Sequence, residues 1–71
     1  MNMTDETAKW VPVRERLPEE AAEYVVMIEG GANATVLLWD GTLWFEEDHE
    51  GWQTYYRVTH WMPMPEPPGE G

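Results

Sequence analysis

The sequence predicts an α+β or mainly β fold, with a small antiparallel sheet of three to four strands and one short helical segment. Short runs rich in valine, threonine and aromatic residues recur along the chain, as is typical of strands. Asp-Gly at positions 40–41 lies between two such runs and is a strong hairpin signal. No long helical period appears, so strands should dominate.

The chain has 71 residues, which suits one domain over 1–71. Within it we expect a polar N-terminal extension at 1–9 and a proline-rich tail at 63–71. The sequence has no cysteine, which excludes disulfides and suits a reducing compartment. Because so small a domain buries only about 60% of its unfolded surface, large side chains must supply its core. We expect this role for the five tryptophans rather than ligand stacking, namely Trp10, Trp39, Trp44, Trp52 and Trp61.

The first half of the chain should contain an extended segment, a helical turn and a strand. Residues 10–13 are apolar and extended, because a residue before proline avoids the helical region, and Trp10 should enter the core. Residues 18–23 begin with proline and carry early glutamates, which favours one or two helical turns. Residues 24–29 are apolar at every position but the last, so this strand should have a covered or interior position in the sheet.

The middle of the chain predicts two more strands, at 34–39 and 42–47. Asp-Gly at 40–41 should join them as a two-residue hairpin that needs positive φ. The turn at 30–33 should join 34–39 to the preceding strand in the same way.

The last strand is expected at 52–61, after an acidic loop at 46–51, and should be central in the sheet. Pro63 should end it, because proline cannot donate to a ladder. The prolines that follow favour an extended tail across the domain, anchored by Trp61 and Met62. The alternative is that these prolines only stop the strand.

The formal net charge is −10, from 14 acidic and four basic residues. This charge opposes direct binding to nucleic acid or to an anionic membrane. It favours association with a basic surface, with solubility alone as the alternative. We expect Arg14 and Arg16 to form internal ion pairs. No apolar run approaches the ~20 residues of a membrane span, and residues 1–6 do not resemble a signal peptide, so we expect a cytoplasmic protein.

The sequence argues against an enzyme. It lacks both serine and cysteine, the usual nucleophiles, and has no phosphate-binding glycine loop. Asp48, His49, Glu50 and His60 match no metal-binding motif. We therefore expect no catalytic residues, no metal and no cofactor.

Acidic residues are the candidate partner-binding groups. If the chain stays extended, Glu46, Asp48 and Glu50 form a row of carboxylates spaced by about 6.6–6.8 Å, roughly two phosphate steps of a nucleic-acid strand. Glu15 and its neighbours would form a second patch by helical spacing. The residues expected to bind a partner are Glu46, Glu47, Asp48 and Glu50, and secondly Glu19, Glu20 and Glu23.

Two segments carry a resemblance to a known family. Residues 10–19 fit a Trp-x-x-Val-x-x-Arg-Leu-Pro pattern, and residues 58–68 fit Val-Thr-His-Trp-Met-Pro-Leu-Pro-x-Pro-Pro, with Met64 in place of the usual leucine. The Trp-Asp-Gly-Thr-Leu-Trp hairpin at 39–44 matches the middle of the pattern. The chain thus resembles a small phage- and prophage-associated domain of unknown function. The resemblance implies phage origin and a β-rich fold, and it transfers no catalytic residue.

Phage context and extreme acidity are similar to those of anti-CRISPR proteins. By this analogy we expect a phage-encoded acidic inhibitor of a host defence system, acting in the host cytoplasm as a monomer or weak homodimer. It would block a basic DNA-binding surface as a nucleic-acid mimic, with a CRISPR effector complex as the partner. The alternative is a non-catalytic phage accessory module that binds a protein through its aromatic and proline-rich tail. Steep weakening of binding by salt would favour the mimic.

Overall fold

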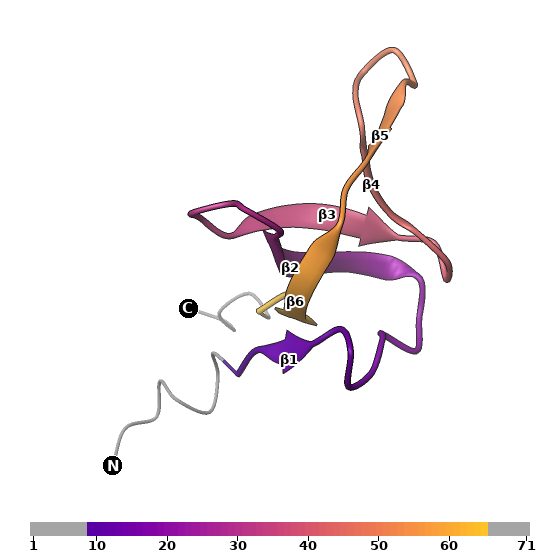
Figure 1. Ribbon diagram of the computed structural model, residues 1–71. Helices are drawn as coiled ribbons and strands as arrows, with labels where there is room; N and C mark the ends of the chain where they lie inside the picture. Colours follow the sequence, from indigo (N-terminus) through magenta and orange to yellow (C-terminus); the bar gives the residue numbers. More distant parts are fainter. Residues whose placement is uncertain (1–8, 66–71) are drawn as a thin grey trace, which may run out of the picture.

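A computed structural model describes residues 9–65, and this part of the chain is all β (Figure 1). Six strands form one open antiparallel sheet in the order β1-β6-β2-β3-β4-β5. The strands are β1 (Val11–Pro12), β2 (Ala22–Ile28), β3 (Thr35–Trp39), β4 (Trp44–Glu47), β5 (Gln53–Tyr55) and β6 (Val58–Pro63). The predicted α+β class and the count of three to four strands are therefore wrong for the described residues.

The helical segment predicted at 18–23 does not form. Pro18 is buried, Glu19 and Glu20 make a bend, and β2 already begins at Ala22. Two helical turns leave most of their backbone groups without an internal partner. In β2 the same backbone pairs with β3 on one side and β6 on the other. The prediction of an interior position for the strand at 24–29 is confirmed, since β2 lies between β6 and β3 in the sheet.

The final strand is central, as predicted, because β6 lies between β1 and β2 and ends at Pro63. The prediction of one strand over 52–61 is wrong, since the chain changes partners at Tyr56 and Arg57. The Tyr56 N–H donates to the Trp44 carbonyl over 3.1 Å, whereas the Arg57 carbonyl accepts from the Glu29 N–H over 2.9 Å. Consecutive strands β5 and β6 therefore pair with opposite parts of a coiled sheet. The tail beyond residue 65, including its predicted path across the domain, lies outside the described residues.

The core lies on the inner face of this sheet. Its buried members come from four strands and are Val26, Leu37, Trp39, Trp44, Val58 and Trp61. Tyr24 packs edge-on against the rings of both Trp44 and Trp61, with ring centroids 6.0 and 5.2 Å apart. Such aromatic pairs add about 0.5–1.5 kcal/mol each beyond burial.

The prediction that all five tryptophans are core is wrong for two of them. Trp52 is 71% exposed in the β4–β5 connection. Trp10 is half-buried beside His60, on the outer face of the sheet, because it precedes β1 by one residue and side chains alternate along a strand.

The predicted ion pairs of Arg14 and Arg16 do not occur among residues 9–65. In this part of the chain, the salt bridge that involves an arginine joins Arg57 to Glu29 over 3.5 Å. Arg16 instead lies over the Trp61 ring, with its guanidinium carbon 5.4 Å from the centroid. Its carbonyl also accepts a hydrogen bond from Trp61 Nε1 over 2.9 Å. The arginine-containing loop is thus attached to the core through an aromatic ring rather than through carboxylates.

The β3–β4 hairpin forms as predicted, but its turn is shifted by one residue. The Asp40 N–H donates to the Leu43 carbonyl, so Gly41 and Thr42 are the two central residues, and the positive φ of 98° falls at Gly41. Asp40 Oδ1 accepts from the N–H groups of Thr42 and Leu43, each over 2.8 Å. These bonds lower the pKa of Asp40, and the bond from the Leu43 N–H has the largest effect. The β2–β3 turn, expected at 30–33, is a longer loop over 29–34.

We expect Asp40→Asn to lower the melting temperature at neutral pH and to matter less in acid. A carboxylate whose folded pKa is depressed stabilises the fold above its unfolded pKa and loses that contribution as pH falls through the folded pKa. The difference from wild type should therefore shrink below the ordinary aspartate pKa of 3.8. Thermal unfolding followed by circular dichroism at several pH values measures this. Glu19→Gln is the control, and an Asp40→Asn effect that stays constant down to the lowest pH would contradict the assignment.

Candidate functional site

The β4–β5 hairpin projects from the rest of the sheet (Figure 1). β4 pairs with β3 only at Phe45 and Trp44, which lie opposite Leu38 and Trp39. Beyond Phe45 it pairs with β5 alone. The outer half of the hairpin is therefore held by its own ladder and turn, and both of its sides are open to a partner.

A tight turn closes the tip of the hairpin. The Asp48 N–H donates to the Trp52 carbonyl, and the Gly51 N–H donates to the Asp48 carbonyl, each over 3.0 Å. Gly51 has φ of 91°, which gives a three-residue loop with a glycine bulge. Asp48 Oδ1 accepts from the N–H groups of Glu50 and Trp52 over 2.9 and 3.0 Å. The extended row predicted for Glu46, Asp48 and Glu50 is therefore wrong, because the chain reverses after Asp48.

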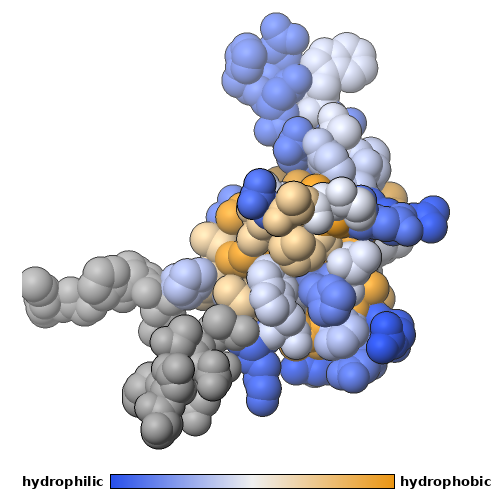
Figure 2. All heavy atoms as spheres, turned by 60° about the vertical axis from the view of Figure 1, so that its left-hand side comes forward, coloured by the Kyte–Doolittle hydropathy of each residue, from blue (hydrophilic) through white to orange (hydrophobic). Residues whose placement is uncertain are grey.

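All four hairpin acids nevertheless stay exposed and close in the chain. Glu46 Oε2 accepts from the Tyr56 hydroxyl over 3.0 Å, and this bond raises the pKa of Tyr56. Glu47 Oε1 accepts from Gln53 over 3.4 Å, and Glu50 lies 3.9 Å from His49. No lysine or arginine occurs between positions 46 and 56. Figure 2 shows hydrophilic and near-neutral residues on the projecting end of the molecule, whereas the hydrophobic residues gather in the body.

The second predicted patch divides into two places. Glu23 lies in β2 opposite Leu38 and lines a hollow that also contains Glu46 and Glu47, so it faces the base of the hairpin. Glu19 and Glu20 lie in the loop before β2 and line a different hollow, near Tyr24 and Trp61. The helical spacing proposed for these residues is wrong, since no helix forms there. Five of the seven predicted residues therefore belong to the hairpin and its base.

Trp52 is the residue of this site that sequence reasoning missed. Its side chain is exposed on the hairpin between the turn and β5, and Tyr55 in β5 is 51% exposed. Exposed aromatic residues are enriched among the residues that contribute most to protein interfaces. The signal that could have found it is its position, because Trp52 directly follows Gly51 at the end of the acidic loop at 46–51.

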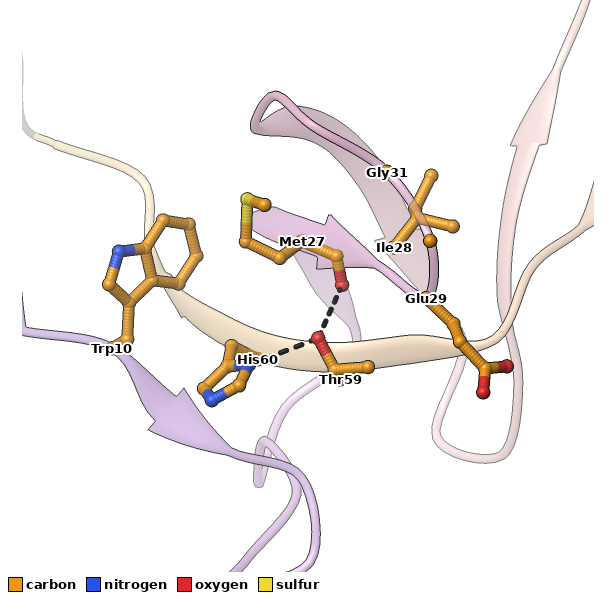
Figure 3. A pocket seen from close by; sticks show the side chains of 8 residues that line it. Trp10, Met27, Ile28, Glu29, Gly31, Thr59 and His60 are labelled. Carbon is orange, nitrogen blue, oxygen red and sulfur yellow. Dashed lines mark hydrogen bonds between the residues drawn. The ribbon is translucent and has the colours of Figure 1, made fainter.

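A separate hollow of about 490 Å³ lies on the outer face of β2 and β6 (Figure 3). Trp10, Met27 and Ile28 form most of its apolar wall. The Thr59 hydroxyl donates to the Met27 carbonyl over 3.3 Å and lies 3.0 Å from His60 Nδ1. The hollow thus combines an apolar wall with the Thr59 hydroxyl and the His60 imidazole.

The four residues considered as metal ligands in the sequence, Asp48, His49, Glu50 and His60, lie in two separate places of the described chain. No group of three or more His, Asp or Glu side chains among residues 9–65 is placed to hold a metal ion. His49 lies in the hairpin turn and His60 lies in β6, so the fold does not bring the two histidines into one cluster with Asp48 and Glu50. Residues 9–65 contain no helix that is long and apolar enough to cross a membrane.

The fold and this site define a small acidic β-sheet domain with a projecting, carboxylate-bearing hairpin. The chain belongs to a family of proteins of unknown function, DUF551, which matches residues 9–69. Both segments that carried the sequence resemblance lie within this match, so a family of unknown function is confirmed. No curated protein and no solved structure matches the chain.

Proposed function

We propose that this domain is a non-catalytic binding module that places its β4–β5 hairpin on a basic, polynucleotide-binding surface of another protein. There it competes with nucleic acid. The observation that carries the proposal is the projection of Glu46, Glu47 and Glu50 on a hairpin that contains no lysine or arginine. A projecting acidic element can enter a groove that a flat acidic face would only cover.

Electrostatics supports this choice of partner. With a net charge of −10, the domain should be drawn to a basic surface over roughly a Debye length, about 8–10 Å in physiological salt. The turn breaks the regular spacing of carboxylates, so the competition depends on charge and on the shape of the hairpin. Trp52 adds a ring face beside the carboxylates, which suits an arginine guanidinium at about 0.5–1 kcal/mol for an exposed site.

The particular target follows from the phage resemblance. A DNA-binding defence complex of the host, with a CRISPR effector as the leading member, presents the required basic channel. The family match supports neither this target nor another, so the target is part of the proposal.

The test is capture followed by competition. Tagged domain is incubated with bacterial lysate at about 50 mM salt, and bound proteins are eluted with about 200 mM salt or with duplex DNA. We expect nucleic-acid-binding proteins to be captured and released by both. The purified partner should then lose DNA binding as the domain is added. Partners that stay bound in excess DNA would contradict the proposal and would favour docking through another surface.

A further inference from the structure

A notch opens where β3 and β4 diverge. The two strands pair at Leu38 with Phe45 and at Trp39 with Trp44, and their pairing ends there. Continued at the same register, the next facing pairs would be Leu37 with Glu46 and then Val36 with Glu47, but β4 pairs beyond Phe45 with β5 alone. The first half of β3 therefore has β2 on one side and an open edge on the other (Figure 1).

The hydrogen-bond alternation shows which backbone groups face this notch. The Asp40 N–H donates to the Leu43 carbonyl, so those residues form a hydrogen-bonded pair. Alternation in an antiparallel ladder makes Leu38 with Phe45 the next hydrogen-bonded pair and directs the N–H and C=O of Val36 to the same side. Val36 lies opposite Val25 on the β2 side, in the pair that does not exchange hydrogen bonds. Its N–H and C=O are thus turned to the open edge, and its side chain is 42% exposed.

The acidic residues around the notch favour a positively charged occupant. A hollow of about 170 Å³ lies there, and its lining includes Glu23, Glu46 and Glu47 beside apolar Leu38 and Phe45. None of these three carboxylates has a lysine or arginine partner within residues 9–65. A second copy of the chain, itself at −10, would be repelled. An extended peptide with lysine or arginine at alternate positions combines backbone pairing with opposite charge.

We propose that this notch is a strand-addition site for a basic, extended peptide segment of the partner. The segment pairs its backbone with Val36 at the free edge of β3, and its lysine or arginine side chains reach Glu23 and Glu47. The inference rests on the proposed function for the basic character of the partner. It adds that the partner is recognised through its main chain as well as its charge.

The probe is a capped eight-residue peptide of alternating lysine and valine. Nuclear magnetic resonance should show that saturating peptide slows hydrogen exchange of the Val36 amide about tenfold or more, while the Gln53 amide at the outer edge of the sheet is unchanged. The same peptide with alternate backbone nitrogens methylated keeps its charge and loses donors, so it should bind about tenfold more weakly.

A matched pair of variants tests the protein side. Val36→Pro removes the N–H at the open edge without removing a bond to β2, and should weaken the lysine–valine peptide about tenfold, whereas Val36→Thr should not. Circular dichroism checks that Val36→Pro is folded, and the methylated peptide serves as the independent test if it is not. Equal binding of the methylated peptide, or protection at Gln53 in place of Val36, overturns the inference. If the peptide results overturn the strand-addition site but DNA still releases the captured partner, the proposed function stands. If DNA does not release the partner, the proposed function fails, whatever the peptide results are.

Discussion

Replacing Trp61 with alanine is expected to unfold most of the domain. Trp61 is 5% exposed and lies in the central strand β6. Its ring packs against Tyr24, the Arg16 guanidinium lies over the ring, and its Nε1 donates to the Arg16 carbonyl. Removing a buried tryptophan costs about 3–5 kcal/mol. A chain of this length has roughly 4–11 kcal/mol in total. The melting temperature should fall by at least about 15 °C.

Trp52→Ala is the matched control for that experiment. The residue type and the change are the same, but the side chain is 71% exposed. Surface substitutions of this kind usually change stability by within about 0.5 kcal/mol. Thermal unfolding and near-ultraviolet circular dichroism of both variants measure the difference. Similar destabilisation by the two substitutions would contradict the division into core and hairpin tryptophans.

The second large effect is expected on binding, from Glu47→Lys combined with Glu50→Lys. Each replacement changes the charge by two units at the projecting part of the hairpin. Glu46 and Asp48 are left unchanged, because they accept hydrogen bonds from Tyr56 and from the turn. Affinity for a partner that DNA releases should fall at least about tenfold, since close charges would now oppose the basic surface. Titration of the purified partner in a DNA-competition assay measures this loss.

The control for this variant carries the same net charge at another place. Glu15→Lys with Glu19→Lys also reverses two exposed acids, but both lie in the loop before β2. If the hairpin is the contact, this control should retain most of the affinity, and the melting temperatures of both variants should stay near wild type. Equal loss in the two variants would show that overall charge, rather than the hairpin, drives association.

Local signals in the sequence predicted much of the sheet, because they depend on short stretches of backbone. Asp40 and Gly41 marked the β3–β4 hairpin, and Pro63 marked the end of β6. The apolar run of β2 indicated an interior strand. The helical turn at 18–23 was wrong because a proline and early glutamates describe only local preference. Pairing of β2 with two neighbours outweighs that preference.

The division of residues 52–61 into β5 and β6 could not be read from the pattern. The whole stretch favours strands, and the exchange of partners at Tyr56 and Arg57 follows from the coiling of the sheet. That exchange also explains the position of Trp52. Trp52 directly precedes β5, which pairs only with β4, so no opposing layer covers its ring. Sequence reasoning located the acidic hairpin, whereas the open edge at Val36 depends on where two strands separate.

The placement of β6 sets a condition on biosynthesis. The strand made last joins both β1 and β2, across sequence separations of about 30 to 50 residues. A nascent chain that still lacks residues 58–63 has no Val58 or Trp61 to complete the buried cluster. The β3–β4–β5 segment can pair locally on the ribosome, but closure of the domain must wait until residues 58–63 have emerged. Such long-range pairing slows folding and leaves apolar strands accessible to chaperones meanwhile.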